Sequence, residues 1–126
     1  MTSRLTQLEE DVIGAILRST QKDIRECLIR QYEGLKVKKR TFTNVGFFTE
    51  FYDCEDVLSC EGVESLRLGG IHAKVLGLKY GAGFVLSIKR GRITLLEGYC
   101  HDEVWPPDAK AVAFFKIQEN GSLIQI

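Results

Sequence analysis

The sequence lacks an excess of either charge. Its 126 residues include 17 Lys and Arg against 17 Asp and Glu, so the formal net charge is zero. Proteins that bind nucleic acid nonspecifically usually carry a basic excess or a basic face. The balance therefore gives no support to general nucleic-acid binding, and it leaves open a segregation of charge on the folded surface.

Long apolar runs are also missing. No stretch approaches the roughly 18 apolar residues that a membrane-spanning helix needs. The N-terminal residues MTSRLTQLEED contain no apolar signal core. The sequence has no low-complexity tract and no linker that would suggest a second domain. We therefore expect one domain over residues 1–126, in the cytoplasm and without a membrane partner.

The cysteines lack the short spacing of metal sites and redox motifs. No C-x-x-C pair occurs among Cys27, Cys54, Cys60 and Cys100. In a cytoplasmic protein this pattern predicts reduced thiols and neither a metal nor another cofactor. The less favoured alternative is a disulfide between Cys54 and Cys60 that closes a short loop under oxidation.

Signatures of common catalytic sites are absent as well. The sequence contains no Gly-x-Ser-x-Gly elbow and no phosphate-binding loop. With only two histidines and four cysteines, a Cys-His nucleophile would rest on coincidence rather than on a motif. These absences favour a protein without enzymatic activity.

What the sequence does contain begins with a helical pattern. Apolar residues recur at helical spacing over residues 2–32. Thr6 followed by Glu9 fits a capping box at the start of the first helix. The pattern breaks at Ser19, and we expect a second helix to begin there with Thr20 as its N-cap.

From residue 35 onward the pattern changes to the alternation of β-strands. We expect about six or seven antiparallel strands, with the lysine-rich residues 36–40 in a protected edge strand. Asn120-Gly121 indicates a type I′ turn near the end of the chain. The fold class predicted from these patterns is α+β, with two N-terminal helices packed on an antiparallel sheet.

The clearest hairpin signal lies in residues 81–96. Alternating apolar residues on the first strand lead into a tight turn at Arg90-Gly91. The second strand is expected to place Ile93 and Leu95 on one face and Thr94 and Leu96 on the other.

Several titratable side chains follow this hairpin directly in the sequence. Among them, Glu97 and His101 could pair as acid and base and, with His72 in a cleft at the strand ends, form the site of a small hydrolase or ligand-binding enzyme. The favoured alternative is that Glu97 ends a strand and residues 101–103 form a solvated acidic turn. For a protein partner, the candidate contacts in this segment are Glu97, His101, Asp102 and Glu103. Trp105 fits two roles equally well, an anchor for a partner surface or a plug for the end of the core.

Two further segments suggest partners. Residues 53–64 are acidic, and Asp53, Glu55, Asp56 and Glu61 are candidate contacts to a basic protein. The basic run at residues 36–40 and the aromatic residues 47–52 suggest a third hypothesis, an RNA-binding module. Core packing and edge protection are the more common roles of such segments, so a nucleic-acid partner is the less favoured interpretation.

A set of short motifs resembles a group of uncharacterised small bacterial proteins. These are GFFTEF at 46–51, GAGFVL at 81–86, LEGY at 96–99, and the DE and WP pairs at 102–103 and 105–106. The resemblance implies a bacterial α+β domain. By type, such small domains are similar to the immunity proteins of contact-dependent growth inhibition systems. The leading hypothesis is therefore a non-enzymatic cytoplasmic protein-binding module that neutralises a cognate toxin domain.

Overall fold

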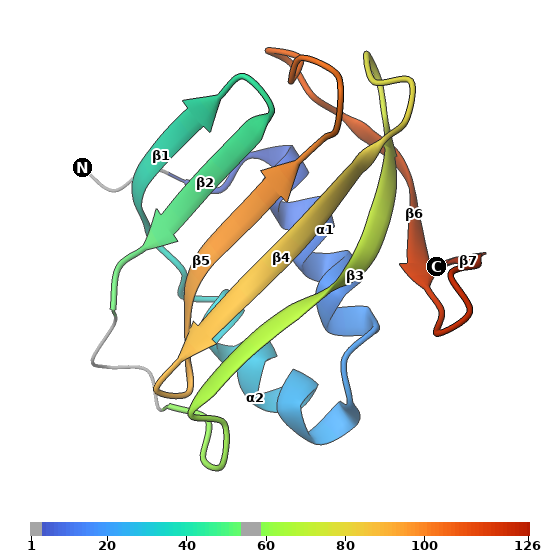
Figure 1. Ribbon diagram of the computed structural model, residues 1–126. Coiled ribbons are helices and arrows are strands. Elements are labelled where there is room, and N and C mark those ends of the chain that lie inside the picture. The colour runs from blue at the N-terminus through green and yellow to red at the C-terminus, as the bar shows by residue number, and fades with distance from the viewer. Residues whose placement is uncertain (1–3, 54–58) are drawn as a thin grey trace.

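The computed structural model describes residues 4–53 and 59–126, and it shows two helices followed by a twisted antiparallel sheet (Figure 1). The sheet has seven strands in the order β1-β2-β5-β4-β3-β6-β7. The α+β prediction is thereby confirmed. The elements are α1 (Gln7–Arg18), α2 (Lys22–Tyr32), β1 (Val37–Thr43), β2 (Gly46–Phe51), β3 (Ser65–Val75), β4 (Ala82–Lys89), β5 (Arg92–Tyr99), β6 (Ala111–Ile117) and β7 (Leu123–Gln125).

Both helices lie against the same face of the sheet (Figure 1). The core forms between these two layers, where Ile13 and Ile16 of α1 are buried together with Phe84, Leu86 and Leu96 of the central strands. Burial of each such side chain contributes about 1.5–3 kcal/mol. No described helix or strand covers the other face of the sheet. None of the described helices is long and apolar enough to cross a bilayer.

The start of α1 is as predicted, but the start of α2 is not. Thr6 and Glu9 exchange both hydrogen bonds of a capping box, at 2.7 and 3.1 Å. The N-cap of α2 is Gln21, which makes no side-chain capping bond. The prediction of Thr20 as the cap is wrong, because its hydroxyl donates instead to the carbonyl oxygen of Ile16, at 2.8 Å. That bond satisfies a carbonyl at the end of α1.

The carboxylate of Glu9 is a charged group that is buried between the layers. The side chain of Glu9 accepts hydrogen bonds from Arg40 on β1 and from Thr49 on β2. Glu9 is only 2% exposed, so its charge depends on these donors in place of water. The contact fixes the first turn of α1 to the edge of the sheet, at β1, where the lysine-rich strand was predicted.

The two turn predictions have different outcomes. At the β4–β5 turn Arg90 and Gly91 have φ angles of 53° and 73°, as a type I′ turn requires. The type I′ prediction for Asn120-Gly121 is wrong, since only Gly121 has a positive φ there. A hydrogen bond from Gly121 N to Gln118 O closes that turn, at 2.9 Å.

The hairpin also contains a β-bulge that the alternation did not indicate. Residues 93–95 of β5 lie opposite residues 87–88 of β4, so β5 carries one extra residue. The extra residue reverses the alternation, and both Ile93 and Leu96 are buried. The prediction that Leu95 shares the face of Ile93 is therefore wrong.

A disulfide joins the helical layer to the sheet. Cys27 of α2 is bonded to Cys60, across 33 positions of sequence, with their Cα atoms 5.9 Å apart. The expectation of reduced thiols is wrong for this pair, because the packing of α2 over the β4–β5 turn brings the two sulfurs together. Cys60 is thus bonded to Cys27 rather than to Cys54, which lies outside the described residues.

Candidate functional site

The sheet face that the helices leave uncovered is a candidate surface for binding (Figure 1). Successive side chains of a strand point to opposite faces. On β2, Phe47 and Phe51 point into the core, so Phe48 and Glu50 point outward. We call this surface the open face. Its outward residues on β1 to β5 include Lys39, Thr41, Phe48, Glu50, Arg67, Val85, Ser87, Leu95 and Glu97.

A groove of about 620 Å³ hollows the open face. Phe48 and Leu95 contribute apolar surface to its lining. The carboxylates of Glu50 and Glu97 come from β2 and β5, whereas the charges of Arg67 and Lys89 come from β3 and β4. Because β2 and β5 are neighbours and β4 and β3 are neighbours, acidic groups line one side of the groove and basic groups the other.

Glu97 is the predicted site residue that lies in this groove. Its Oε2 atom is 3.5 Å from Nη2 of Arg67. The Arg67 side chain is largely exposed, and solvent-exposed ion pairs contribute little to stability. The pair therefore remains available to a partner that offers charges of its own.

The two histidines do not join Glu97 in the groove. His72 lies on β3, paired with Gly83 on one side and Phe115 on the other. His101 is exposed beyond the end of β5, with its ring 5.4 Å from the ring of Tyr99. Neither histidine is among the residues that line the groove. The hydrolase hypothesis requires one shared cleft, and the groove of the open face does not bring Glu97 together with either histidine.

The segment after β5 holds the remaining tail candidates. Glu103 accepts hydrogen bonds from the backbone N–H groups of Lys79 and Tyr80, at 2.6 and 2.9 Å, and so fixes the loop before β4. Asp102 is exposed, with a φ of 57°. Asp is among the residues that tolerate this left-handed conformation. His101, Asp102 and Val104 are thus tail residues that are exposed to a partner.

Trp105 fills the end of the core. It is 8% exposed, and its ring lies 5.4 Å from that of Phe47 and 6.3 Å from that of Phe84. The sequence left two roles open for Trp105. In the structure its ring packs at the end of the core.

Cys100 lies beside this tail and is buried as a free thiol. Burial, together with the charge of Glu103, raises the pKa of the Cys100 thiol. A raised pKa keeps the sulfur protonated near neutral pH, so Cys100 does not have the character of an activated nucleophile. Among the residues that the structure describes, no group of three or more His, Cys, Asp and Glu side chains could hold a metal ion.

The acidic segment is described only in part. Asp53 is exposed and its Oδ1 atom lies 2.5 Å from Nη1 of Arg92. Glu61 is exposed as well. Glu55 and Asp56 lie outside the described residues. The described acidic residues therefore flank the β4–β5 turn, at one end of the sheet.

Part of the surface that the RNA-binding hypothesis requires is buried or engaged in other contacts. Arg40 of the basic run is engaged by Glu9, and the rings of Phe47 and Phe51 are buried. Only Phe48 and Tyr52 of this aromatic segment are exposed. Successive bases of a single strand need a platform of several exposed rings.

Sequence reasoning missed most of the groove. It identified Glu97 as a candidate, included Phe48 only within the aromatic residues 47–52 of the RNA-binding hypothesis, and did not identify Arg67. The available signal was the alternation on β2 and β3, which places these side chains opposite the buried ones. Their meeting with Glu97 depends on the strand order, which alternation does not reveal. Comparison of the chain with protein-family models, with curated proteins and with solved structures finds no match.

Proposed function

We propose that the chain is a non-enzymatic protein-binding module that receives its partner on the open face. The observation that carries this proposal is the groove of about 620 Å³ on an uncovered sheet face. Phe48 and Leu95 offer apolar contact area, and charges of both signs flank them. Aromatic residues and arginine at the centre of such a surface commonly contribute most of the binding energy.

The arrangement of the titratable groups supports binding rather than catalysis. Glu97 lies in the groove next to Arg67, His101 lies in solvent beyond β5, and Glu103 holds a loop. An acid–base mechanism would need at least two of them within reach of one reacting atom.

The proposed partner is the toxin domain of a contact-dependent growth inhibition system, which makes the chain an immunity protein. The similarity of this small domain to immunity proteins in size and type, rather than in any motif, supports this finer proposal. Glu50 and Glu97 on the open face would attract and orient a basic toxin domain. A location in the cytoplasm stays a prediction, and the disulfide is more typical of proteins in an oxidising compartment.

Variants of the open face test the proposal directly. Titration calorimetry would use the toxin domain encoded beside this gene, with Phe48→Ala and Glu97→Lys as the test variants. We expect each to weaken binding at least about tenfold, or about 1.4 kcal/mol. Ile29→Ala and Lys22→Glu are matched controls on the exposed side of α2 and should bind as the wild type does.

Two outcomes would contradict the proposal. One is wild-type affinity in both open-face variants, and the other is failure of the wild-type chain to rescue cells that express the neighbouring toxin. The variant Asp102→Asn distinguishes a contact through the tail, because asparagine removes the charge and still tolerates the left-handed backbone. Weaker binding in this variant alone would move the interface from the open face to the tail.

A further inference from the structure

The β4–β5 turn is the point at which several distant segments are held together. The carbonyl oxygen of Gly91 accepts two hydrogen bonds, from Cys60 N at 2.8 Å and from Gln31 Nε2 at 2.7 Å. A Cβ atom on Gly91 would lie only 2.6 Å from the carbonyl oxygen of Cys60. The backbone of Cys60 is therefore pressed directly against the turn and held there independently of its sulfur.

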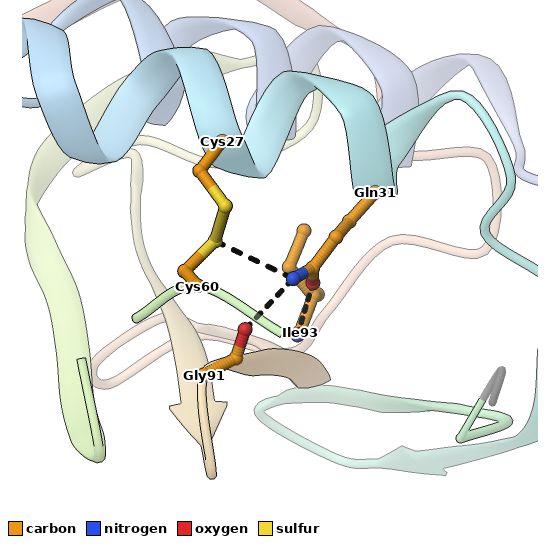
Figure 2. Close-up of a disulfide and its surroundings, with 5 residues drawn as sticks. All are labelled: Cys27, Gln31, Cys60, Gly91 and Ile93. Carbon is orange, nitrogen blue, oxygen red and sulfur yellow. Dashed lines mark hydrogen bonds between the residues drawn. A yellow bond between two sulfur atoms is a disulfide. The ribbon is translucent and has the colours of Figure 1, made fainter. Parts of the chain in front are cut away.

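The two halves of the disulfide differ in their surroundings (Figure 2). Cys60 is 5% exposed, whereas Cys27 is only partly buried on α2. Gln31 lies one helical turn after Cys27, and its Nε2 atom is 3.4 Å from Sγ of Cys60. Cys27 is thus the more exposed residue of the pair, and Cys60 has an amide donor beside its sulfur.

We propose that the Cys27–Cys60 disulfide is a thiol-exchange site, at which Sγ of Cys27 takes an incoming thiolate and Cys60 leaves. Access decides which sulfur is attacked. The Nε2–H group of Gln31 hydrogen-bonds the departing Cys60 thiolate, and this bond offsets part of the cost of a buried charge. The ligand class is a small thiol such as glutathione, or the dithiol of a protein reductant.

The electrons and atoms of the exchange balance in two steps. The incoming thiolate forms a bond to Sγ of Cys27 as the bond between Cys27 and Cys60 breaks, and the electron pair of that bond stays on Cys60. A second thiolate of the reductant then attacks the mixed disulfide and releases Cys27. The dithiol is oxidised to a disulfide, and Cys27 and Cys60 each end as a thiol after taking up one proton.

Reduction would loosen one contact between the layers and leave the sheet intact. The bonds of Cys60 and Gln31 to Gly91 do not involve sulfur, so the turn keeps them. The site does not depend on the proposed partner, since it rests on α2, Cys60 and the turn alone.

Trapping with glutathione under native conditions tests the site. The Cys54→Ser chain would be incubated with reduced glutathione, quenched with N-ethylmaleimide and mapped by peptide mass spectrometry. We expect glutathione on Cys27 and the maleimide on Cys60. Two results would overturn the proposal. One is glutathione attached to Cys60. The other is an exchange rate no faster than the rate of global unfolding, which pulse proteolysis measures.

The role of Gln31 has its own variant. In Gln31→Glu the carboxylate loses both donors of the amide, to Cys60 Sγ and to the carbonyl oxygen of Gly91, and it places a negative charge beside the leaving thiolate. We expect exchange to slow at least about tenfold, as for a lost hydrogen bond to a charged group. The matched control is Gln21→Glu, on an exposed position before the same helix. Equal exchange rates in the two variants would overturn the role assigned to Gln31. If Gln31→Glu does not fold, the glutathione map of the Cys54→Ser chain still tests whether Cys27 is the attacked residue.

Discussion

Glu9 and Arg40 form a bidentate ion pair between the helical layer and the sheet. Nε of Arg40 lies 2.9 Å from Oε2 of Glu9, and Nη2 lies 2.8 Å from Oε1. Thr49 adds a third donor to the same carboxylate, at 2.6 Å. Paired geometry of this kind fixes orientation as well as distance. The contact therefore sets where α1 begins relative to β1 and β2.

Replacement of this carboxylate should destabilise the fold. Glu9→Gln leaves the Arg40 guanidinium in a partly buried position without its counter-charge, which should lower the free energy of unfolding by about 3 kcal/mol. Urea denaturation followed by far-UV circular dichroism measures the change. Glu10→Gln, at the exposed neighbouring position in the same turn, is the control and should change stability by less than about 0.5 kcal/mol. Equal effects in the two variants would contradict a special role of the pair.

The same carboxylate should make stability depend on acid. Burial alone would raise the pKa of Glu9, but hydrogen bonds from Arg40, Thr49 and Thr6 outweigh it and lower the pKa below its ordinary value. The unfolded chain thus takes up this proton first as the pH falls. The stabilisation is present above the unfolded pKa of about 4.3 and is lost as the pH falls through the folded pKa.

The measurement compares the wild type with Glu9→Gln by urea denaturation at about pH 7, 5 and 3. The stability difference between the two proteins should be largest at neutral pH and should shrink at the most acidic point. A difference that stays constant over this range would show that the charge of Glu9 does not carry the effect.

The core position of Trp105 leads to a prediction on stability rather than on binding. Trp105→Ala removes the ring that packs against Phe47 and Phe84, and truncation of a buried Trp typically costs about 3–5 kcal/mol. The control is Val104→Ala, a neighbour that is 74% exposed, with an expected change within about 0.5 kcal/mol. Urea denaturation followed by circular dichroism compares them. A Trp105→Ala protein as stable as this control would refute the core role.

Two glycines with similar backbone angles should respond differently to alanine. Gly91 and Gly121 have φ angles of 73° and 85°, so alanine at either position costs about 1–2 kcal/mol in backbone strain. At Gly91 the added Cβ would also lie 2.6 Å from the carbonyl oxygen of Cys60, whereas at Gly121 it would meet no atom within 4 Å.

Gly91→Ala should therefore destabilise the protein by about 1–3 kcal/mol more than Gly121→Ala. Thermal and urea denaturation of both variants provide the comparison. If both lose the same stability, Cys60 is not held against the turn as tightly as the structure indicates.

The local features of the fold could be predicted from the sequence. The capping box of Thr6 and Glu9 depends on residues three positions apart, and the Arg90-Gly91 turn depends on two adjacent ones. Alternation identified β4, and the composition of β1 identified an edge strand. Each of these features arises from interactions within a short stretch of chain, so periodicity and residue type are sufficient to reveal them.

The candidate site, the disulfide and the β5 bulge all depend on tertiary packing. The open face brings Phe48, Arg67 and Glu97 together from three different strands, β2, β3 and β5. The disulfide joins positions 33 residues apart, and the β5 bulge reverses an alternation that looked regular. These contacts depend on strand order, register and the face that the helices cover. The sequence by itself thus determined the elements and their polarity, because those follow from neighbouring residues, whereas the site exists only where the packed sheet brings distant residues together.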